Sequence, residues 1–381
     1  MIVFSAIGPM ALNIFFPSMP SMMKVFDTDY GTVQFALTLY LTALAMAQLF
    51  VGPISDRVGR RPVVLWGMGI CMAGSLTCIF APTIGVLIMG RILQALGAST
   101  GMVMARSMIR DMHGLDKAAS MIGYVTMVMV VAPMVSPTLG ALLEKAFDWR
   151  AGFVLVLFVT AGVLAVSVSI LGETHKGPYE AAGIGRMLGA FVTLLKQRRF
   201  NRHAFQISLS SAAFFTFLGG APYVSIQLLG MSGVEYGLYF MVASLSYMAG
   251  NFTTGRMSER WGSDRLITLG TSVGLLGGLM LALAYVSDHF TPVSLFGCMG
   301  MIALGNGLCL PSGTASAISA DKNHIGAAAG LSGFLQMATG ALASYTVGIM
   351  LSDSAFPLVA MMASSVALAF IVNLISLNHR A

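Results

Sequence analysis

Apolar stretches of about 20 residues alternate with short polar segments along the whole chain, and such a stretch wound as a helix matches the hydrocarbon thickness of a bilayer. No segment shows the two-residue alternation over about ten residues that membrane strands require. The pattern therefore predicts an all-α integral membrane protein with twelve transmembrane helices. The predicted spans are residues 1–20, 32–53, 62–81, 84–106, 119–143, 152–172, 204–228, 234–256, 266–287, 292–318, 325–350 and 355–377.

The composition agrees with this class. Hydrophobic residues make up 56% of the chain and charged residues 9%, whereas a soluble domain carries about 25% charged residues. The four cysteines fall inside apolar spans, with the spacing of neither a disulfide framework nor a metal site, so no cofactor or metal is expected. The six histidines lie at span ends or in loops without a catalytic spacing, so no catalytic residue or enzyme activity is expected.

The distribution of basic residues predicts the orientation. Most of the 21 Lys and Arg residues fall on the side that holds the segments after even-numbered spans and the C-terminus. The positive-inside rule makes that side cytoplasmic and predicts that both termini are cytoplasmic. The net charge of +6 is then a topology signal, and no nucleic-acid partner is expected. Because no basic region precedes the first span, a cleaved signal peptide is not expected.

The longest polar stretch lies near the middle of the chain. It divides the sequence into an N-terminal six-helix bundle (residues 1–175), a cytoplasmic linker (176–203) and a C-terminal six-helix bundle (204–381). Within the linker, apolar residues of segment 187–195 can share one helical face beside basic residues, which predicts a helix lying in the membrane interface. A solvated linker is the alternative.

The two halves repeat one another. Residues 52–59 (GPISDRVG) and 255–262 (GRMSERWG) place a glycine, a serine, an acid, an arginine and a second glycine at the same spacing. Residues 95–97 (ALG) recur at 303–305 (ALG). Internal duplication of this kind is typical of transporters that move two bundles around a central site.

Residues 52–62, GPISDRVGRRP, match the loop signature G-x-x-x-D-R-x-G-R-R of the major facilitator superfamily at every defined position. The chain resembles that superfamily over essentially its full length, which implies two pseudo-symmetric six-helix bundles, the major facilitator fold. Asp56 can pair with arginines or a helix N-terminus and latch a cytoplasmic gate, or the loop only sets the topology. The predicted gate and switch residues are Gly52, Asp56, Arg57, Gly59, Arg60, Arg61, Glu259 and Arg260.

Two further motifs resemble the exporter branch of this superfamily. Residues 91–97, RILQALG, are similar to the fourth-span pattern R-x-x-Q-G-x-G, whose arginine is implicated in proton transfer in that family. An uncompensated cation inside a span costs several kcal/mol, so Arg91 is expected to face the bundle interior or water; a purely structural arginine is the alternative. The positions of the antiporter pattern G-x8-G-x3-G-P-x2-G-G are occupied by Gly123, Ala132, Ser136, Pro137, Gly140 and Ala141, which a generic close-packed helix explains almost as well.

Residues 11–20, ALNIFFPSMP, resemble the first span of the Bcr/CflA drug-resistance family, T-D-M-Y-L-P-A-L-P, with parallels at 148–153, 173–174 and 221–223. Where that family carries an embedded aspartate, this chain has Asn13, and none of its 15 acids falls deep in a span. Asparagine cannot carry a proton, so coupling through a gate acid, charge movement by a cationic substrate and facilitated exchange all stay open. The predicted proton-coupling or central polar site is Arg91, Gln94 and Asn13.

The 29 Met and 23 Phe residues suit an apolar, adaptable cavity. The resemblance implies a monomeric secondary active multidrug efflux transporter of the bacterial inner membrane. It would export small amphipathic compounds across the lipid bilayer by alternating access, in exchange for protons. A metabolite exporter or importer of the same fold, or a facilitated exchanger not coupled to protons, is the alternative. The predicted substrate cavity comprises Gln34, Phe214, Phe215, Tyr223, Tyr239, Tyr247, Asn251, Asn306 and Gln336.

Overall fold

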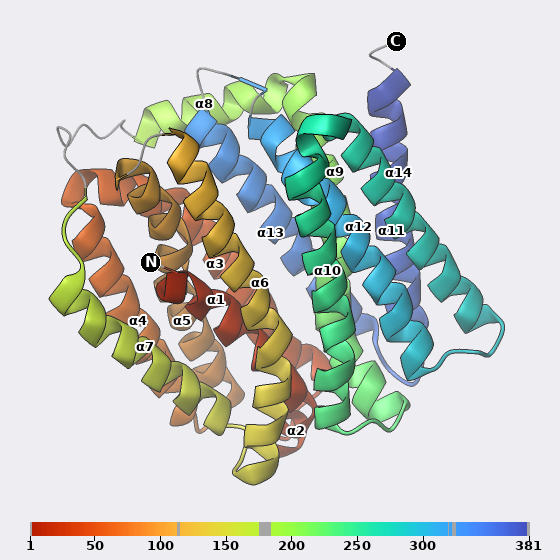
Figure 1. Ribbon diagram of the computed structural model, residues 1–381. Coiled ribbons are helices and arrows are strands. Elements are labelled where there is room, and N and C mark those ends of the chain that lie inside the picture. The colour runs from red at the N-terminus through yellow and green to blue at the C-terminus, as the bar shows by residue number, and fades with distance from the viewer. Residues whose placement is uncertain (1, 113–114, 175–183, 319, 322–324, 379–381) are drawn as a thin grey trace. The chain divides into compact units, whose positions relative to one another are not determined.

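The structure of this chain, a computed structural model, describes residues 2–112, 115–174, 184–318, 320–321 and 325–378, with only the backbone at some of these positions. The described residues form helices joined by short connections (Figure 1). The chain divides into two compact units, Met1–Gly183 and Ile184–Ala381.

Unit 1 contains the helices that correspond to the first six predicted spans. Asp29 caps the second of them: its Oδ2 accepts from the Thr32 N–H at 3.0 Å and its Oδ1 from the Thr32 hydroxyl at 2.6 Å. These hydrogen bonds, the hydroxyl foremost, lower the pKa of the Asp29 carboxyl. The elements are α1 (Ile2–Asn13), the 3-10 turn η1 (Phe16–Ser18), α2 (Met19–Val25), α3 (Tyr30–Val58), α4 (Arg60–Ile79), α5 (Ile84–Met112), α6 (Leu115–Ala146) and α7 (Ala151–Ile170).

The first predicted span, residues 1–20, is interrupted in the structure. The helix α1 ends at Asn13, and Phe16–Ser18 and α2 follow it as separate pieces. Pro17 and Pro20 each lie at the start of one of these pieces. A proline lacks the N–H that an uninterrupted helix would use and its ring clashes with the preceding turn, so two prolines three residues apart end the first helix early. The expectation of one continuous first helix was wrong.

Unit 2 contains the linker helix and the helices of the last six predicted spans. The seventh span starts at Arg198, earlier than predicted, and ends in a π-helical turn. Pro222 lies just before this turn and has no N–H for the regular ladder. The elements are α8 (Ile184–Lys196), α9 (Arg198–Tyr223), η2 (Val224–Leu228), α10 (Gly233–Trp261), α11 (Ser263–Val286), α12 (Pro292–Ile318), α13 (Ile325–Met350) and α14 (Phe356–Asn378).

The same neighbours recur in the two units, which confirms the pseudo-symmetry. In unit 1, α5 packs against α1, α3 and α4, while α1 packs against α6 and α4 against α7. In unit 2, α12 packs against α9, α10 and α11, while α9 packs against α13 and α11 against α14. The helices of the six predicted spans in one unit therefore have counterparts with matching main partners in the other, and the twelve predicted spans are confirmed as helices, the first in pieces.

Glycines let the two central helix pairs approach closely at matching places. A Cβ on Gly97 of α5 would meet the backbone of Gly67 and Cys71 on α4. A Cβ on Gly305 of α12 would meet the backbone of Gly270 and Gly274 on α11 in the same way. Small residues at such a crossing allow backbone-to-backbone packing, the main source of helix association in lipid. The repeated ALG triplet in the sequence is therefore a repeated packing contact.

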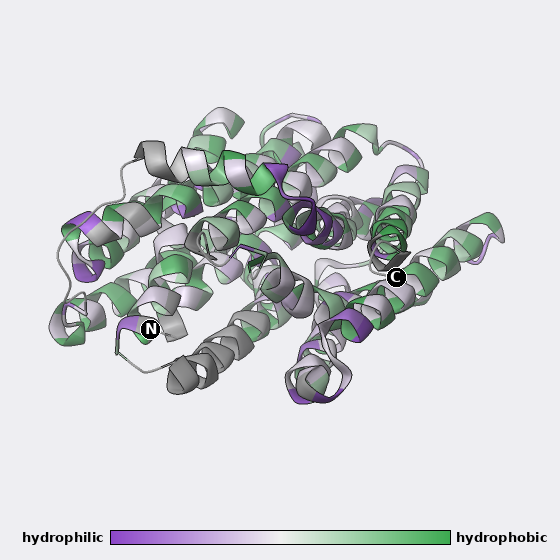
Figure 2. Ribbon diagram, turned by 90° about the horizontal axis from the view of Figure 1, so that it is seen from above, coloured by the Kyte–Doolittle hydropathy of each residue, from purple (hydrophilic) through white to green (hydrophobic). Residues whose placement is uncertain are grey.

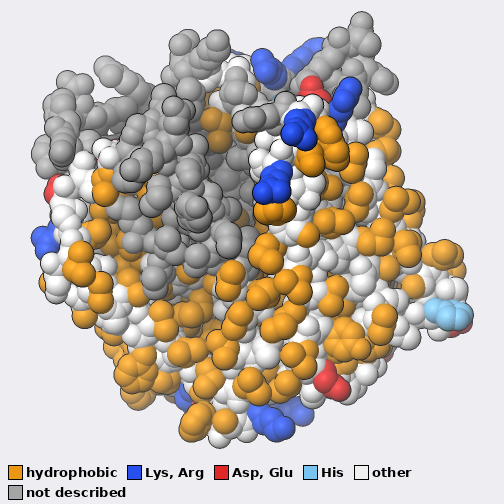
Figure 3. Space-filling view, in the orientation of Figure 1, with side chains coloured by type: hydrophobic (Ala, Val, Ile, Leu, Met, Phe, Trp, Pro, Cys, Tyr) orange, Lys and Arg blue, Asp and Glu red, His pale blue; other side chains and the backbone are white. Residues whose placement is uncertain are grey.

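The outer faces are apolar. Among the described residues, eight helices are long and apolar enough to cross a membrane: α3, α4, α5, α7, α9 with η2, α11, α12 and α14. Large side chains such as Trp66 and Phe158 are exposed by 72% and 70%, and hydrophobic residues recur along the helices in Figure 2. In Figure 3 hydrophobic side chains are spread over much of the coloured surface. A surface of this kind needs lipid as its solvent, so the protein is a multi-pass membrane protein.

The helix α8 follows residues 175–183, which lie outside the described part of the predicted linker. Its Leu194 is buried in a cluster with Phe200, Ala204 and Leu331, so α8 packs on unit 2. Val192 and Leu195 are about half exposed on the same helix, at 54% and 47%. That leaves apolar side chains available for the membrane interface, which stays a prediction.

Candidate functional site

The guanidinium of Arg91 lies inside unit 1, on α5. Its side chain is 0% exposed, and Nη1 donates to the Ala11 carbonyl oxygen at 2.8 Å and to Gln94 Oε1 at 2.5 Å. Its Cζ lies 4.1 Å from the centroid of the Tyr40 ring and 4.7 Å from that of Phe15. Within the described part of the chain no ion pair involves Arg91. Neutral acceptors and aromatic faces therefore surround this cation.

A chain of polar groups continues from Arg91 towards α4. Gln94 Nε2 donates to Ser75 Oγ at 2.9 Å, and Ser75 Oγ donates to the Cys71 carbonyl oxygen at 2.9 Å. The Nε and Nη2 atoms of Arg91 have no hydrogen-bond partner among the described residues. Buried donors without partners are costly and uncommon. The cluster thus keeps two donor atoms of a cation for a further polar partner.

Asn13 lies at the end of α1, two residues after the Ala11 carbonyl that Arg91 binds. Its Nδ2 donates to the Pro9 carbonyl oxygen at 2.7 Å, and its Oδ1 has no partner among the described residues. Of the predicted central polar site, Arg91 and Gln94 are therefore in direct contact, whereas the described contacts of Asn13 stay within α1. Gln34 of α3, predicted to line the cavity, is fully buried.

The corner between α3 and α4 holds the signature loop. Gly59 both ends α3 and begins α4 with φ +94°, a left-handed conformation that favours glycine. Arg60 follows it and is buried; its Nε forms a 3.0 Å ion pair with Oδ2 of Asp111 on α5, and its Nη1 donates to Ser55 Oγ. Arg60 therefore joins three helices, α3, α4 and α5, at one end of the unit.

A carboxylate from another helix caps α4. Glu173, just after α7, accepts from the backbone N–H of Arg60 at 2.9 Å and from that of Arg61 at 3.1 Å. The first N–H groups of a helix lack internal partners, and a negative charge there also meets the positive end of the helix dipole. The sequence marked Glu173 only as a family parallel. The sequence did hold one indication of this role. Gly59 lies at the N-cap of α4 and has no side chain that could accept from the first N–H groups, so another residue must cap the helix.

For the remaining predicted gate residues, the described positions show no contact with this corner. The side chains of Asp56 and Glu259 lie outside the described residues, so their pairing stays a prediction. Arg57 and Arg260 are exposed, and nothing lies within 4 Å of a Cβ built on Gly52.

The antiporter-like motif lies on α6, which contains Pro133 and Pro137. Ser136 is buried and its hydroxyl donates to the Ala132 carbonyl oxygen at 2.6 Å. A Cβ on Gly140 would meet the Ile14 carbonyl oxygen, so this glycine lets α6 approach the end of α1. The side-chain position of Gly123 lies outside the described residues. Of the described motif residues, Gly140 therefore brings α6 against Ile14, the residue that follows Asn13 at the end of α1.

The other predicted cavity residues belong to unit 2, where they fall into separate groups. The rings of Phe214 and Phe215 lie 5.8 Å apart, and Phe215 covers Gly340 of α13. Tyr239 contacts Phe296, with ring centroids 5.4 Å apart. Asn251 Nδ2 donates to the Tyr247 carbonyl oxygen at 2.8 Å, Asn306 is buried, and Tyr223 and Gln336 are half-buried.

An aromatic cluster joins α9, α10 and α12, and it includes Tyr239 of the predicted cavity residues. The ring of Phe296 lies 5.5 Å from Phe217 and 5.8 Å from Tyr236, and Phe217 lies 6.1 Å from Phe240. These four side chains are all fully buried. They form a core that fixes one end of the three helices, so Tyr239 belongs to a packed wall.

A second polar cluster in unit 2 was also missed. Gln206 Nε2 donates to Ser210 Oγ at 3.1 Å, and Cys309 Sγ lies 3.6 Å from the same hydroxyl. Gln206 Oε1 and Ser208 Oγ have no partner among the described residues. These residues lie on α9 and α12, the counterparts of α1 and α5, which hold the Arg91 contact. Corresponding helices thus carry a charged cluster in unit 1 and an uncharged one in unit 2.

Comparisons with known proteins agree with this architecture. Residues 1–344 match the model of the Major Facilitator Superfamily. Multidrug resistance protein D of Escherichia coli is 30% identical over 348 residues, 90% of this chain and 86% of that protein. The bicyclomycin resistance protein homolog of Haemophilus influenzae is 26% identical over 96% of this chain and 92% of that protein. A chloramphenicol resistance protein of Pseudomonas aeruginosa is 26% identical over 79% of this chain and 71% of that protein.

Solved structures show the same fold at low identity. A crystal structure of a D-xylose-proton symporter superposes with a TM-score of 0.76 at 11% identity, covering 97% of this chain and 95% of the symporter. A crystal structure of a POT family transporter superposes with a TM-score of 0.77 at 13% identity, covering 99% of this chain and 93% of that transporter. Together with the sequence matches, the repeated six-helix units and the signature corner at Gly59, they show that the chain belongs to the major facilitator superfamily of membrane transporters, within its Bcr/CflA drug-resistance family.

Proposed function

We propose that this protein is a secondary active multidrug efflux transporter, which exports small amphipathic compounds by alternating access in exchange for protons. Its relatives include multidrug, bicyclomycin and chloramphenicol resistance proteins, and their names support the substrate class. The proposal places the protein in the bacterial inner membrane as a monomer. The basic residues of its loops support the orientation with both termini in the cytoplasm.

The buried guanidinium of Arg91 carries the proposal. A cation at the centre of a span costs at least about 3 kcal/mol. Its two hydrogen bonds and its contacts with Tyr40 and Phe15 offset part of this cost, since a desolvated cation–π contact contributes up to about 2 kcal/mol. The unpartnered Nε and Nη2 leave the cation with unused binding capacity in the bundle. A neutral residue would pack there at lower cost, so the charge has a use.

Arg91 serves exchange by setting the local potential. A fixed positive charge lowers the proton affinity of any acid or amine that comes near it. It therefore favours release of a proton from a neighbouring group and discourages a cationic substrate from staying. In this scheme Arg91 does not titrate. It alternates between polar partners as the bundle moves.

A second candidate, facilitated exchange without protons, is favoured by Asn13. The amide stands where related exporters carry an aspartate, and its described contacts stay within α1. No acid of the described residues pairs with Arg91. Substrate exchange would then need only the alternating motion.

Flux into and out of reconstituted vesicles separates these functions. Vesicles of the purified protein should accumulate or release chloramphenicol or bicyclomycin against its gradient when a pH gradient is imposed, and collapse of that gradient should stop the uphill step. Equal flux with and without the pH gradient would exclude proton antiport and favour facilitated exchange. Absence of flux for both compounds, with flux of a metabolite, would replace multidrug efflux itself.

The variant Asn13→Asp restores a titratable group where the family has one. Under the exchange function it should create a dependence of flux on the pH gradient, and under antiport it should strengthen the existing one. The matched control is Asn13→Leu, which is of similar size and cannot bind a proton. If Asn13→Asp has the same pH profile as the native protein, this position is not where a proton couples.

A further inference from the structure

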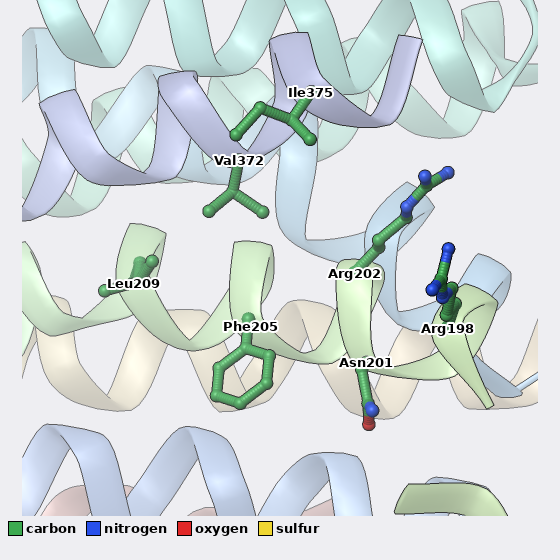
Figure 4. A pocket seen from close by; sticks show the side chains of 7 residues that line it. All are labelled: Arg198, Asn201, Arg202, Phe205, Leu209, Val372 and Ile375. Atoms are coloured by element: carbon green, nitrogen blue, oxygen red, sulfur yellow. The ribbon is translucent and has the colours of Figure 1, made fainter. Parts of the chain in front are cut away.

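A groove on unit 2 lies between the beginning of α9 and the end of α14. It encloses about 430 Å³ and is lined by side chains of these two helices. Figure 4 shows Val372 and Ile375 of α14 on one side, with Arg198 and Arg202 gathered at one end and Leu209 towards the other. The seven lining residues are Arg198, Asn201, Arg202, Phe205, Leu209, Val372 and Ile375.

The groove has a charged end and an apolar length. On α9, Arg198, Arg202, Phe205 and Leu209 follow one another at intervals of three or four, so they form a stripe along one face of the helix, with Asn201 beside it. Arg198 and Arg202 come first, and Phe205 and Leu209 follow one and two turns further along. Phe205 and Ile375 are 54% and 51% exposed, so the apolar part is open to the surroundings. No ion pair among the described residues uses either arginine.

The length of the helix places the two ends of the groove in different layers of a membrane. The segment Arg198–Leu228 has 31 residues, which at about 1.5 Å per residue gives about 45 Å. The hydrocarbon core of a bilayer is about 30 Å thick. The first turns of α9 therefore extend into the headgroup layer, while Phe205 and Leu209 lie at the level of the acyl chains.

We infer that this groove binds an anionic phospholipid, whose phosphate lies between Arg198 and Arg202 and one of whose acyl chains lies along Phe205, Leu209, Val372 and Ile375. A guanidinium pairs well with a phosphate through several N–H donors. An acyl chain covers the exposed apolar side chains, which a soluble anion would leave bare. The positive-inside orientation assigns the lipid to the cytoplasmic leaflet, where anionic lipids are attracted by basic residues. This inference goes beyond the proposed transport and does not depend on it.

The lipid should join α9 to α14. These helices pack against each other, and the groove is where their side chains leave a gap near one end. A bound acyl chain fills that gap with methylene groups in contact with both helices. The occupied groove is therefore expected to make unit 2 more resistant to unfolding than the empty one.

The test measures binding of phosphatidylglycerol to the purified full-length protein in a neutral detergent, by native mass spectrometry and by the melting temperature. Phosphatidylglycerol with long acyl chains should bind and raise the melting temperature more than phosphatidylcholine. The double variant Arg198→Gln/Arg202→Gln should weaken binding by about five-fold for each arginine. The matched control Arg199→Gln/Arg265→Gln removes the same charge from exposed helix starts outside the groove, and should stay within about two-fold of the native protein.

A second variant tests the acyl-chain part. Leu209→Trp fills the groove but keeps both arginines, so it should weaken binding of the long-chain lipid while leaving binding of glycerol phosphate unchanged. Equal losses in the two double variants would show that only total charge matters and would overturn the site. Glycerol phosphate binding as tightly as the lipid would show an anion site without an acyl chain. A dimer whose stability depends on Leu209 would show that a second copy of the chain occupies the groove.

Discussion

The cation of Arg91 is held by neutral partners, and no described acid pairs with it. Its acceptors, the Ala11 carbonyl and Gln94, carry no charge, and Tyr40 and Phe15 contribute only ring faces. An ion pair in this place would lock the side chain to one partner, because a buried pair is costly to break. Weaker partners let the guanidinium change its contacts as the helices move.

Replacing Arg91 should therefore affect transport more than folding. Arg91→Ala should bring uphill flux down to the level of empty vesicles, while insertion and the amount of folded protein stay close to native. Arg91→Lys keeps the charge but loses the planar guanidinium that stacks on Tyr40 and Phe15 and carries the further donors Nε and Nη2, so its flux should be intermediate. The measurement is flux per folded transporter in vesicles. Native flux in the alanine variant would remove Arg91 from the mechanism.

Glu173 offers a second test at the level of one side chain. Glu173→Gln keeps the shape but removes the negative charge from the start of α4, which should cost about 1 kcal/mol of stability. For a unit of this size that corresponds to a melting temperature lower by about 2–4 °C. Asp353→Asn, in an exposed connection, serves as the control and should leave the melting temperature unchanged. Equal melting temperatures for all three proteins would show that the cap contributes no stability.

At the level of helices, the positions of the spans were predictable and their inner faces were not. Spans of apolar residues have the length of a bilayer, so eleven of the twelve could be placed to within a few residues. Which side of a span faces its neighbours could not be read, because lipid and core are both apolar. Phe217 is fully buried and Phe205 is 54% exposed, although both lie on α9 in similar sequence. The aromatic cluster was missed for this reason.

The close helix crossings were easier to predict from the sequence than the inner faces, because glycine inside a membrane helix allows the backbone of a neighbour to approach. Gly97→Ala and Gly305→Ala should each destabilise the protein by about 1–3 kcal/mol, because the added methyl group would meet the backbone of α4 or α11. Gly69→Ala and Gly297→Ala lie on α4 and α12 with nothing within 4 Å of the new methyl group, and should be neutral or slightly stabilising. Thermal unfolding in detergent compares the four. Similar losses in all of them would assign the effect to glycine in general.

At the scale of the whole molecule, the repeat gives each unit the same set of helix neighbours, but the two units differ in charge. The central cluster on α5 and α1 holds Arg91, whereas that on α12 and α9 holds Gln206, Ser210 and Cys309. The sequence revealed the charged cluster through a family motif and the repeat through the glycines. It gave no sign of the uncharged cluster, because single serines and glutamines in a span have no fixed spacing.

The acids of the repeated motif, Asp56 and Glu259, can be tested across the whole molecule. Asp56→Asn should lower flux strongly while leaving insertion intact, since a gate that loses its charge loses one of its two states. Glu259→Gln, at the repeated position, should have a similar effect if the two halves use the loop alike. Asp148→Asn is the control, because Asp148 is an exposed acid whose partner among the described residues is the neighbouring Arg150. Unchanged flux in Asp56→Asn would leave the loop as a topology signal alone.

The left-handed backbone at Gly59 and Gly262 limits which substitutions the protein can accept at these two positions. Both residues join two long helices, with φ +94° and φ +75°, and any other residue there would strain the backbone whatever space surrounds it. The other glycine of each repeated motif, Gly52 or Gly255, has nothing within 4 Å of its Cβ position. A library of all single substitutions, selected for folded protein, should therefore tolerate changes at the first glycine of each motif and reject them at the second.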